Sequence, residues 1–142
     1  MLDTILVKKA LEICYKAHEG QYDKGGEPYV KHPVFVAEQM DDEYLVCVAL
    51  LHDVVEDTEY TLQDLITCGF PDEIIEAVKC ITKEKGMDYM DYIKIVKTNP
   101  MATKVKLKDL EHNSDLSRLK HVDESAYRRL EKYKKAKEYL LS

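Results

Sequence analysis

The sequence predicts an all-α fold in which about seven to eight helices form one bundle. Apolar residues recur at helical spacing along most of the 142 residues. No run of alternating apolar and polar residues is bounded by turn signals, as a β-strand would require. Residues that commonly begin or end helices stand between the apolar stretches. At this length, residues 1–142 are expected to form a single domain around a single core.

The first two predicted helices flank a polar loop. The first helix spans residues 2–17 and is stopped by Gly20. Its expected apolar face is formed by Ile5, Leu6, Ala10, Leu11, Cys14 and Tyr15. The loop, with the sequence GQYDKGGEPYVKHP, is long enough to carry function. A short helix is then expected at residues 33–40, where Pro33 suits the first turn.

An almost entirely apolar segment, residues 44–55, predicts a helix that is buried on every side. Either Asp41 or Asp42 can cap its first turn. The stretch ALLHDVVEDTEY adds ionisable residues at its end, and on a helical wheel these fall within an arc of roughly 140°. They are His52, Asp53, Glu56 and Asp57. Such groups are costly to bury unless something compensates them, and a bound metal ion would do so.

Five more helices are expected, at residues 61–68, 71–81, 88–97, 99–111 and 123–141. Thr61 and Asp64 have the spacing of a capping box. The dipeptide Asn99-Pro100 provides an N-cap followed by proline in the first turn. These capping signals locate the first residues of the two helices more precisely than apolar periodicity alone does.

The net charge of −6 is distributed unevenly along the chain. Residues 32–78 contain twelve Asp and Glu but no Lys or Arg, and the basic residues gather in the C-terminal third. Binding to duplex nucleic acid requires a continuous basic face, so this class of partner is not expected. An acidic region that holds a cation, with lysines nearby, fits a small phosphorylated ligand better.

The sequence also predicts the cellular compartment of the protein. No apolar run reaches the roughly 18 residues of a membrane-spanning helix, and the N-terminus lacks the basic-then-apolar order of a signal peptide. A cytoplasmic protein with no membrane partner is therefore expected. The four cysteines form no C-x-x-C pair, which argues against a zinc knuckle or a redox motif.

Two imidazoles and two carboxylates are the candidate ligands of a divalent metal ion. They are His32, His52, Asp53 and Asp109. His32 follows the glycine-containing loop, and Asp109 lies in the stretch KVKLKDLEHN of a later helix. This mixed nitrogen and oxygen set suits Mn²⁺, Fe²⁺ or Zn²⁺ with water completing the coordination. It does not suit a closed structural zinc site.

Three stretches in order carry a family resemblance. They are AHEGQYDKGGEPYVKHPVFVA, ALLHDVVEDT and VKLKDLEHN, within residues 17–113. Together they resemble the HD-domain phosphohydrolase superfamily, and within it the hydrolase domain of RelA/SpoT proteins and the single-domain small alarmone hydrolases. The resemblance implies an HD-domain helical bundle and a (p)ppGpp 3′-pyrophosphohydrolase, which releases pyrophosphate from the ribose 3′ position, usually with Mn²⁺. The chain is too short for the family's synthetase domain, so no synthetase activity is expected.

The resemblance also assigns roles to individual residues. The implied metal ligands are His32, His52, Asp53 and Asp109. Glu56 and Asp57 match the catalytic acidic pair, and Lys24 and Asn113 match residues that contact the substrate. Physical chemistry agrees, because a carboxylate one turn beyond the ligands can accept a proton from an attacking water.

Three positions depart from the family pattern. Asp23 stands where the family has an arginine that packs on the guanine base, and Leu110 and Asp115 replace two further arginines. Base recognition is therefore expected to be looser than in the family, while the metal chemistry is retained. The exact substrate is left open by these changes, as are the metal, the oligomeric state and the regulation.

Two alternative functions remain at this stage. One is an HD-type hydrolase that acts on another small phosphorylated nucleotide or metabolite. The other is a non-catalytic nucleotide-binding sensor, against which the acidic pair Glu56 and Asp57 counts. His18 is expected either to favour its helix dipole or to have a supporting or substrate-contacting role at the site. His112 is expected to be exposed or structural.

Overall fold

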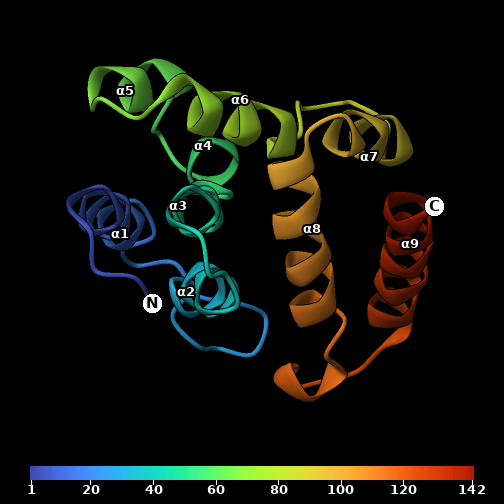
Figure 1. Cartoon of the computed structure of the whole chain (residues 1–142). Coiled ribbons are helices and arrows are strands. Elements are labelled where there is room, and N and C mark those ends of the chain that lie inside the picture. The colour runs from blue at the N-terminus through green and yellow to red at the C-terminus, as the bar shows by residue number, and fades with distance from the viewer.

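The structure, a computed structural model, describes all 142 residues and is built from α-helices without a β-strand (Figure 1). The all-α prediction is confirmed. The helices are α1 (Ile5–Ala17), α2 (Lys31–Glu38), α3 (Glu43–Leu51), α4 (Val54–Asp57), α5 (Leu62–Thr67), α6 (Asp72–Ile81), α7 (Tyr89–Lys97), α8 (Pro100–Asn113) and α9 (Glu124–Leu141). A 3₁₀ turn, η1 (Leu116–Arg118), lies between α8 and α9. Counted with α3 and α4 as one interrupted helix, the bundle has eight helices, within the predicted range.

Helix α3 lies at the centre of the bundle. It packs against α1 and α2 on one side and against α6 and α8 on the other, and α9 stands beside α8 at the right of Figure 1. Every residue of α3 from Leu45 to Leu51 is buried, as expected for a helix that is apolar on all sides. One continuous core of 29 buried residues joins these helices. None of the helices combines the length and the apolar character needed to cross a membrane.

The predicted helix caps are confirmed. Asp42 accepts hydrogen bonds from the first-turn N–H groups of α3, and Asn99 caps α8, which has proline in its first turn. Thr61 and Asp64 form the reciprocal bonds of a capping box at α5. Each of these contacts is local in sequence, which is why it could be expected from the sequence alone.

The apolar face predicted for the first helix is partly wrong. Ile5 and Tyr15 are exposed, whereas Val7 and Ile13 are buried together with Ala10 and Cys14. Apolar residues surround most of α1, so periodicity could not distinguish the face that meets α3.

The predicted helix over residues 44–55 is interrupted between Leu51 and Val54. The Ala49 carbonyl accepts both the backbone N–H of His52, at 3.5 Å, and its Nδ1–H, at 2.5 Å. The imidazole therefore bonds to the helix end, and the chain turns before α4 begins. Consequently the ionisable residues do not form a stripe on one continuous helix. Two lie at the interruption and two in the short α4.

Candidate metal centre and active site

Four side chains from three parts of the chain converge at one point. His32 comes from α2, His52 and Asp53 from the interruption between α3 and α4, and Asp109 from α8. One ligand atom from each lies within 4.8 Å of all the others. The Asp109 Oδ1 lies 2.7 Å from the His32 Nε2 and 3.3 Å from the His52 Nε2. All four residues that the sequence predicts as ligands are thus brought together.

The orientation of His52 fits a metal ligand. Its Nδ1 must carry the proton, because its partner is the Ala49 carbonyl oxygen, which only accepts. The Nε2 therefore faces the cluster, where it lies 3.1 Å from the Asp53 Oδ2. An imidazole fixed in this way by a backbone carbonyl is a common arrangement in metal sites. The donor set of two imidazoles and two carboxylates fits a first-row divalent ion.

The electrostatics of the site favour ionised carboxylates. Burial opposes ionisation of Asp109, but the Lys106 ammonium and the two histidines hold the pKa of Asp109 well below its usual range. Burial also opposes protonation of His52, but Asp53 and Asp109 outweigh it and raise the pKa of that imidazole. In the absence of metal, the cluster is therefore expected to retain a proton on His52, which an incoming metal ion must displace.

Lys106 is a site residue that the sequence did not reveal. Its Nζ lies 2.8 Å from the Asp109 Oδ2, and the two side chains are 12% and 5% exposed. It also lies over the Tyr92 ring, 5.2 Å from the centroid. This buried ion pair neutralises one of the two negative charges that the ligand carboxylates contribute.

Replacing Lys106 by methionine is expected to destabilise the metal-free protein by about 3 kcal/mol, because Asp109 would keep a buried charge without its cation. Added Mn²⁺ should restore much of this loss. Lys108→Met is the matched control, since Lys108 pairs with Glu111 on the exposed face of α8 and such pairs contribute less than about 1 kcal/mol. Urea unfolding with and without Mn²⁺ measures both variants, and equal losses would contradict the role of Lys106.

Other side chains hold the ligands in position. The Tyr29 hydroxyl donates to the Asp53 Oδ2 at 2.6 Å, and the Asn113 Nδ2 donates to the Asp109 Oδ1 at 3.0 Å. The Nδ1 atoms of His32 and His112 lie 2.7 Å apart, and their rings are parallel. Burial and then Arg118 lower the pKa of His112 to about 4, so its ring is neutral near pH 7. His112 packs between His32 and Phe35, and its structural role stays a prediction.

His18 supports the polar loop. It is buried at the end of α1, and its Nδ1 lies 2.9 Å from the Gln21 Oε1. Its ring centroid lies 5.0 Å from that of Tyr29, which bonds to Asp53. His18 is the C-cap of α1 and also contacts the loop, so both expectations for this residue remain predictions.

The acidic pair Glu56 and Asp57 lines a pocket of about 470 Å³ beside Asp53 and Asp109. Lys83, Lys106 and Lys132 line the same pocket, as do Tyr89 and Tyr133. The Glu56 Oε1 accepts the backbone N–H of Lys83 at 2.7 Å. Partial burial, Asp53 and then Glu56 raise the pKa of Asp57 to about 7. A carboxyl group that titrates near neutral pH is suited to proton transfer.

Asp57 should make the metal-free protein less stable as the pH rises. Its pKa is higher in the folded than in the unfolded state, so the folded state binds the proton more tightly, and stability falls between about pH 4 and pH 7. Because the side chain is solvent-accessible, the loss is expected to be only about 1 kcal/mol. Asp57→Asn should remove this part of the pH dependence. Urea unfolding at both ends of the range tests this, with the exposed Glu59→Gln as a control.

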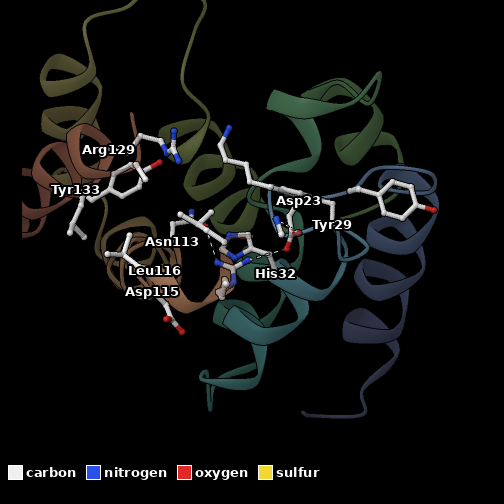
Figure 2. Close-up of a pocket in the computed structure, with 15 residues that line it drawn as sticks. Asp23, Tyr29, His32, Asn113, Asp115, Leu116, Arg129 and Tyr133 are labelled. Atoms are coloured by element: carbon white, nitrogen blue, oxygen red, sulfur yellow. Dashed lines mark hydrogen bonds and ion pairs between the residues drawn. The ribbon is translucent and has the colours of Figure 1, made fainter. Parts of the chain in front are cut away.

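A second pocket, of about 310 Å³, is lined by His32 and shares Tyr29, Asn113 and Tyr133 with the first. Figure 2 shows Arg129 and Tyr133 on one side of it, Asp23, Tyr29 and His32 on the other, and Asn113 between them. It is lined by Tyr22, Asp23, Lys24, Gly25, Tyr29, His32, Asn113, Asp115, Leu116, Arg118, Leu119, Ala126, Arg129, Leu130 and Tyr133. Both predicted substrate-contacting residues, Lys24 and Asn113, are among them.

The three positions at which family arginines are missing have different environments. Leu110 is buried in the core and lines neither pocket. Asp115 caps η1, where its side chain accepts from Ser117. Asp23 accepts the backbone N–H groups of Gly25 and Glu27 and so holds the turn of the loop. Cationic groups reach the pocket from elsewhere, on Arg118 and Arg129, and no local signal in the sequence pointed to them.

Curated relatives match parts of this chain. A guanosine-3′,5′-bis(diphosphate) 3′-pyrophosphohydrolase of Borreliella burgdorferi is 39% identical over 79 residues, and the bifunctional (p)ppGpp synthase/hydrolase SpoT of Escherichia coli is 38% identical over 89 residues. They cover 53% and 60% of this chain. A probable GTP pyrophosphokinase of Mycobacterium leprae is 34% identical over 122 residues, or 76% of this chain. The matches span only 12% of the first two relatives and 15% of the third.

A solved structure supports the fold. It is described as a metazoan ortholog of SpoT that hydrolyzes ppGpp and plays a role in starvation responses. The two folds agree with a TM-score of 0.79 at 24% sequence identity, over 99% of this chain and 88% of that chain. A family model described as HD domain matches residues 10–135. Because this match covers most of the sequence, the chain belongs to the HD domain family.

Proposed function

We propose that this chain is a metal-dependent phosphohydrolase, and specifically a (p)ppGpp 3′-pyrophosphohydrolase without synthetase activity. One observation carries the proposal: the cluster of His32, His52, Asp53 and Asp109 lies where the pocket that holds Glu56 and Asp57 meets a second pocket lined by cationic, acidic and apolar side chains. The names of the curated relatives support the choice of substrate. The proposed unit is one HD-type phosphohydrolase domain, residues 1–142, and the continuous core supports this.

The four ligands would hold one divalent ion. Mn²⁺ is proposed, and Fe²⁺ or Zn²⁺ would also suit the same donors. When bound, such an ion activates water and polarises the phosphoryl group. His52 and His32 would bind it through Nε2, and the two carboxylates would offset its charge. Lys106 would then keep Asp109 in place through their ion pair.

The remaining side chains have complementary roles in this proposal. Glu56 or Asp57 takes a proton from the attacking water and orients it for in-line displacement at phosphorus. Lys83 and Lys132, in the same pocket, would offset the charge of the pyrophosphate, which gains the water oxygen. The bond from that phosphorus to the ribose 3′ oxygen breaks in the same step, and this oxygen takes up a proton. Lys24 and Asn113 would contact the nucleotide in the second pocket.

The test is a screen of the purified, Mn²⁺-supplemented protein against ppGpp, pppGpp and other phosphorylated nucleotides. Released pyrophosphate and orthophosphate are measured separately. Pyrophosphate release from ppGpp and pppGpp is the expected result. Orthophosphate release from other nucleotides would instead favour a different HD-type hydrolase. Binding without turnover of any substrate would favour a nucleotide sensor.

A further inference from the structure

The polar loop packs directly on the segment that connects α8 to α9. A Cβ added at Gly25 would overlap the carbonyl oxygen of Arg118, and one added at Gly26 would lie 2.8 Å from the Lys120 Nζ. These glycines allow the loop to approach the η1 turn closely. Two segments about 95 positions apart in the sequence therefore meet beside the second pocket, which both of them line.

Arg118 is held by several contacts where these two segments meet. Its Nη1 donates to the His112 carbonyl oxygen at 2.8 Å and to the Asn113 Oδ1 at 3.3 Å. Its Nη2 lies 3.5 Å from the Asp23 Oδ2. A guanidinium has five N–H donors, so the Nε–H and one Nη2–H remain without a protein partner. The side chain is thus fixed by several contacts and still retains donors for a ligand.

The two arginines of the pocket differ in electrostatic character. The charge of Arg118 is offset by Asp23, and both side chains are largely buried, at 22% and 16% exposed. Arg129 bonds to the Ser125 hydroxyl and makes no ion pair. An arginine whose charge is already compensated attracts a phosphate weakly, whereas its donors still suit a neutral acceptor group. Arg129 and Lys24 retain their full charge for phosphates.

We propose, on the basis of the proposed function, that Arg118 recognises the guanine base in place of the loop arginine that Asp23 replaces. Its two free donors match the O6 and N7 acceptors of guanine, whereas adenine presents an amino group where guanine has O6. The apolar side chains of Leu116, Leu119 and Leu130 line the same pocket and would cover the base. Asp23 is a positioning residue, because it holds Arg118 and the loop together. This proposal replaces the expectation of loose base recognition.

The test compares Arg118→Ala and Arg118→Lys with Arg128→Ala, an exposed arginine on α9 that pairs with Glu124 outside the pocket. Calorimetric binding of ppGpp and of its adenine counterpart is measured in Mn²⁺-loaded Glu56→Gln protein, and hydrolysis is measured in the otherwise unchanged enzyme. Arg118→Ala should weaken ppGpp binding by about tenfold or more and affect the adenine nucleotide little. Arg118→Lys should resemble it, because an ammonium lacks the planar pair of donors. Arg128→Ala should change neither affinity.

The outcomes separate this proposal from the proposed function. Hydrolysis of ppGpp with unchanged affinity in Arg118→Ala would overturn the role of Arg118 and leave the function intact. Equal losses for the two nucleotides, or full retention of affinity in Arg118→Lys, would also overturn it, because both indicate a contact with phosphate. Guanine-specific loss of binding in a protein that hydrolyses nothing would support Arg118 and overturn the function. Absence of binding to either nucleotide would overturn both.

Discussion

Asp53→Ala is expected to remove metal binding and phosphohydrolase activity together. Asp53 provides one of the two carboxylates in the cluster, and its Oδ2 lies 3.1 Å from the His52 Nε2 and 3.8 Å from the His32 Nε2. Without it, the site keeps two imidazoles and a single carboxylate. We expect metal affinity to fall by at least about 100-fold, as losses of even outer-shell partners approach that size. Activity should fall by at least about 1,000-fold, because metal catalysis contributes several kcal/mol.

Metal content by mass spectrometry and pyrophosphate release are measured on the same preparation of the Asp53→Ala variant. Asp41→Ala serves as the control, since Asp41 is an exposed aspartate before α3 and lines neither active-site pocket. It should retain both properties. An Asp53→Ala protein that keeps stoichiometric Mn²⁺ would show that the ion is held elsewhere.

Glu56→Gln should instead separate metal binding from turnover. We expect the variant to keep its metal and to lose about 10²–10⁴-fold in kcat, the usual contribution of acid–base catalysis. The Glu56 Oε1 accepts the Lys83 N–H, and a glutamine oxygen can accept the same bond, so the fold of the pocket should be preserved. Only the ability to take a proton is removed.

Glu59→Gln, an exposed neighbour outside the pocket, should leave kcat unchanged and controls for the loss of one negative charge. Metal loss in Glu56→Gln as large as that in Asp53→Ala would mean that Glu56 is itself a ligand. Unchanged kcat in Glu56→Gln would transfer the proton-accepting role to Asp57, and Asp57→Asn would then be the variant that loses turnover.

Features that depend on near neighbours in the sequence could be predicted. Asp42 and Asn99 each bond to an N–H two or three residues along the chain, so their cap roles are visible in the sequence. The all-α fold followed from periodicity, which is also a local property. The four residues of the metal cluster could be named because their types and order match a family, and the structure brings them together.

Features that depend on distant contacts could not be predicted. Arg118 meets Asp23 across 95 positions, and Lys106 is distinguished from Lys104 and Lys108 only by its burial beside Asp109. The interruption before α4 arises from a side chain, His52, that takes a backbone acceptor at the helix end. Helix propensity fits the residues of that segment well. It does not account for a side chain that competes with backbone N–H groups for the Ala49 carbonyl oxygen.

Helix α9 contributes Arg129, Leu130 and Tyr133 to the second pocket but none of the four clustered residues. It packs mainly against α7 and α8, at the edge of the bundle in Figure 1. Arg129 and Leu130 line only the second pocket, whereas Lys132 and Tyr133 of the same helix also line the pocket of Glu56 and Asp57. In the proposed enzyme, substitutions at Arg129 and Leu130 should therefore change which nucleotide is accepted and leave the hydrolytic centre intact. For protein engineering, these two positions are accordingly the ones to randomise when a new phosphorylated substrate is sought. In evolution, changes at the same two positions would let relatives acquire different substrates without passing through inactive intermediates.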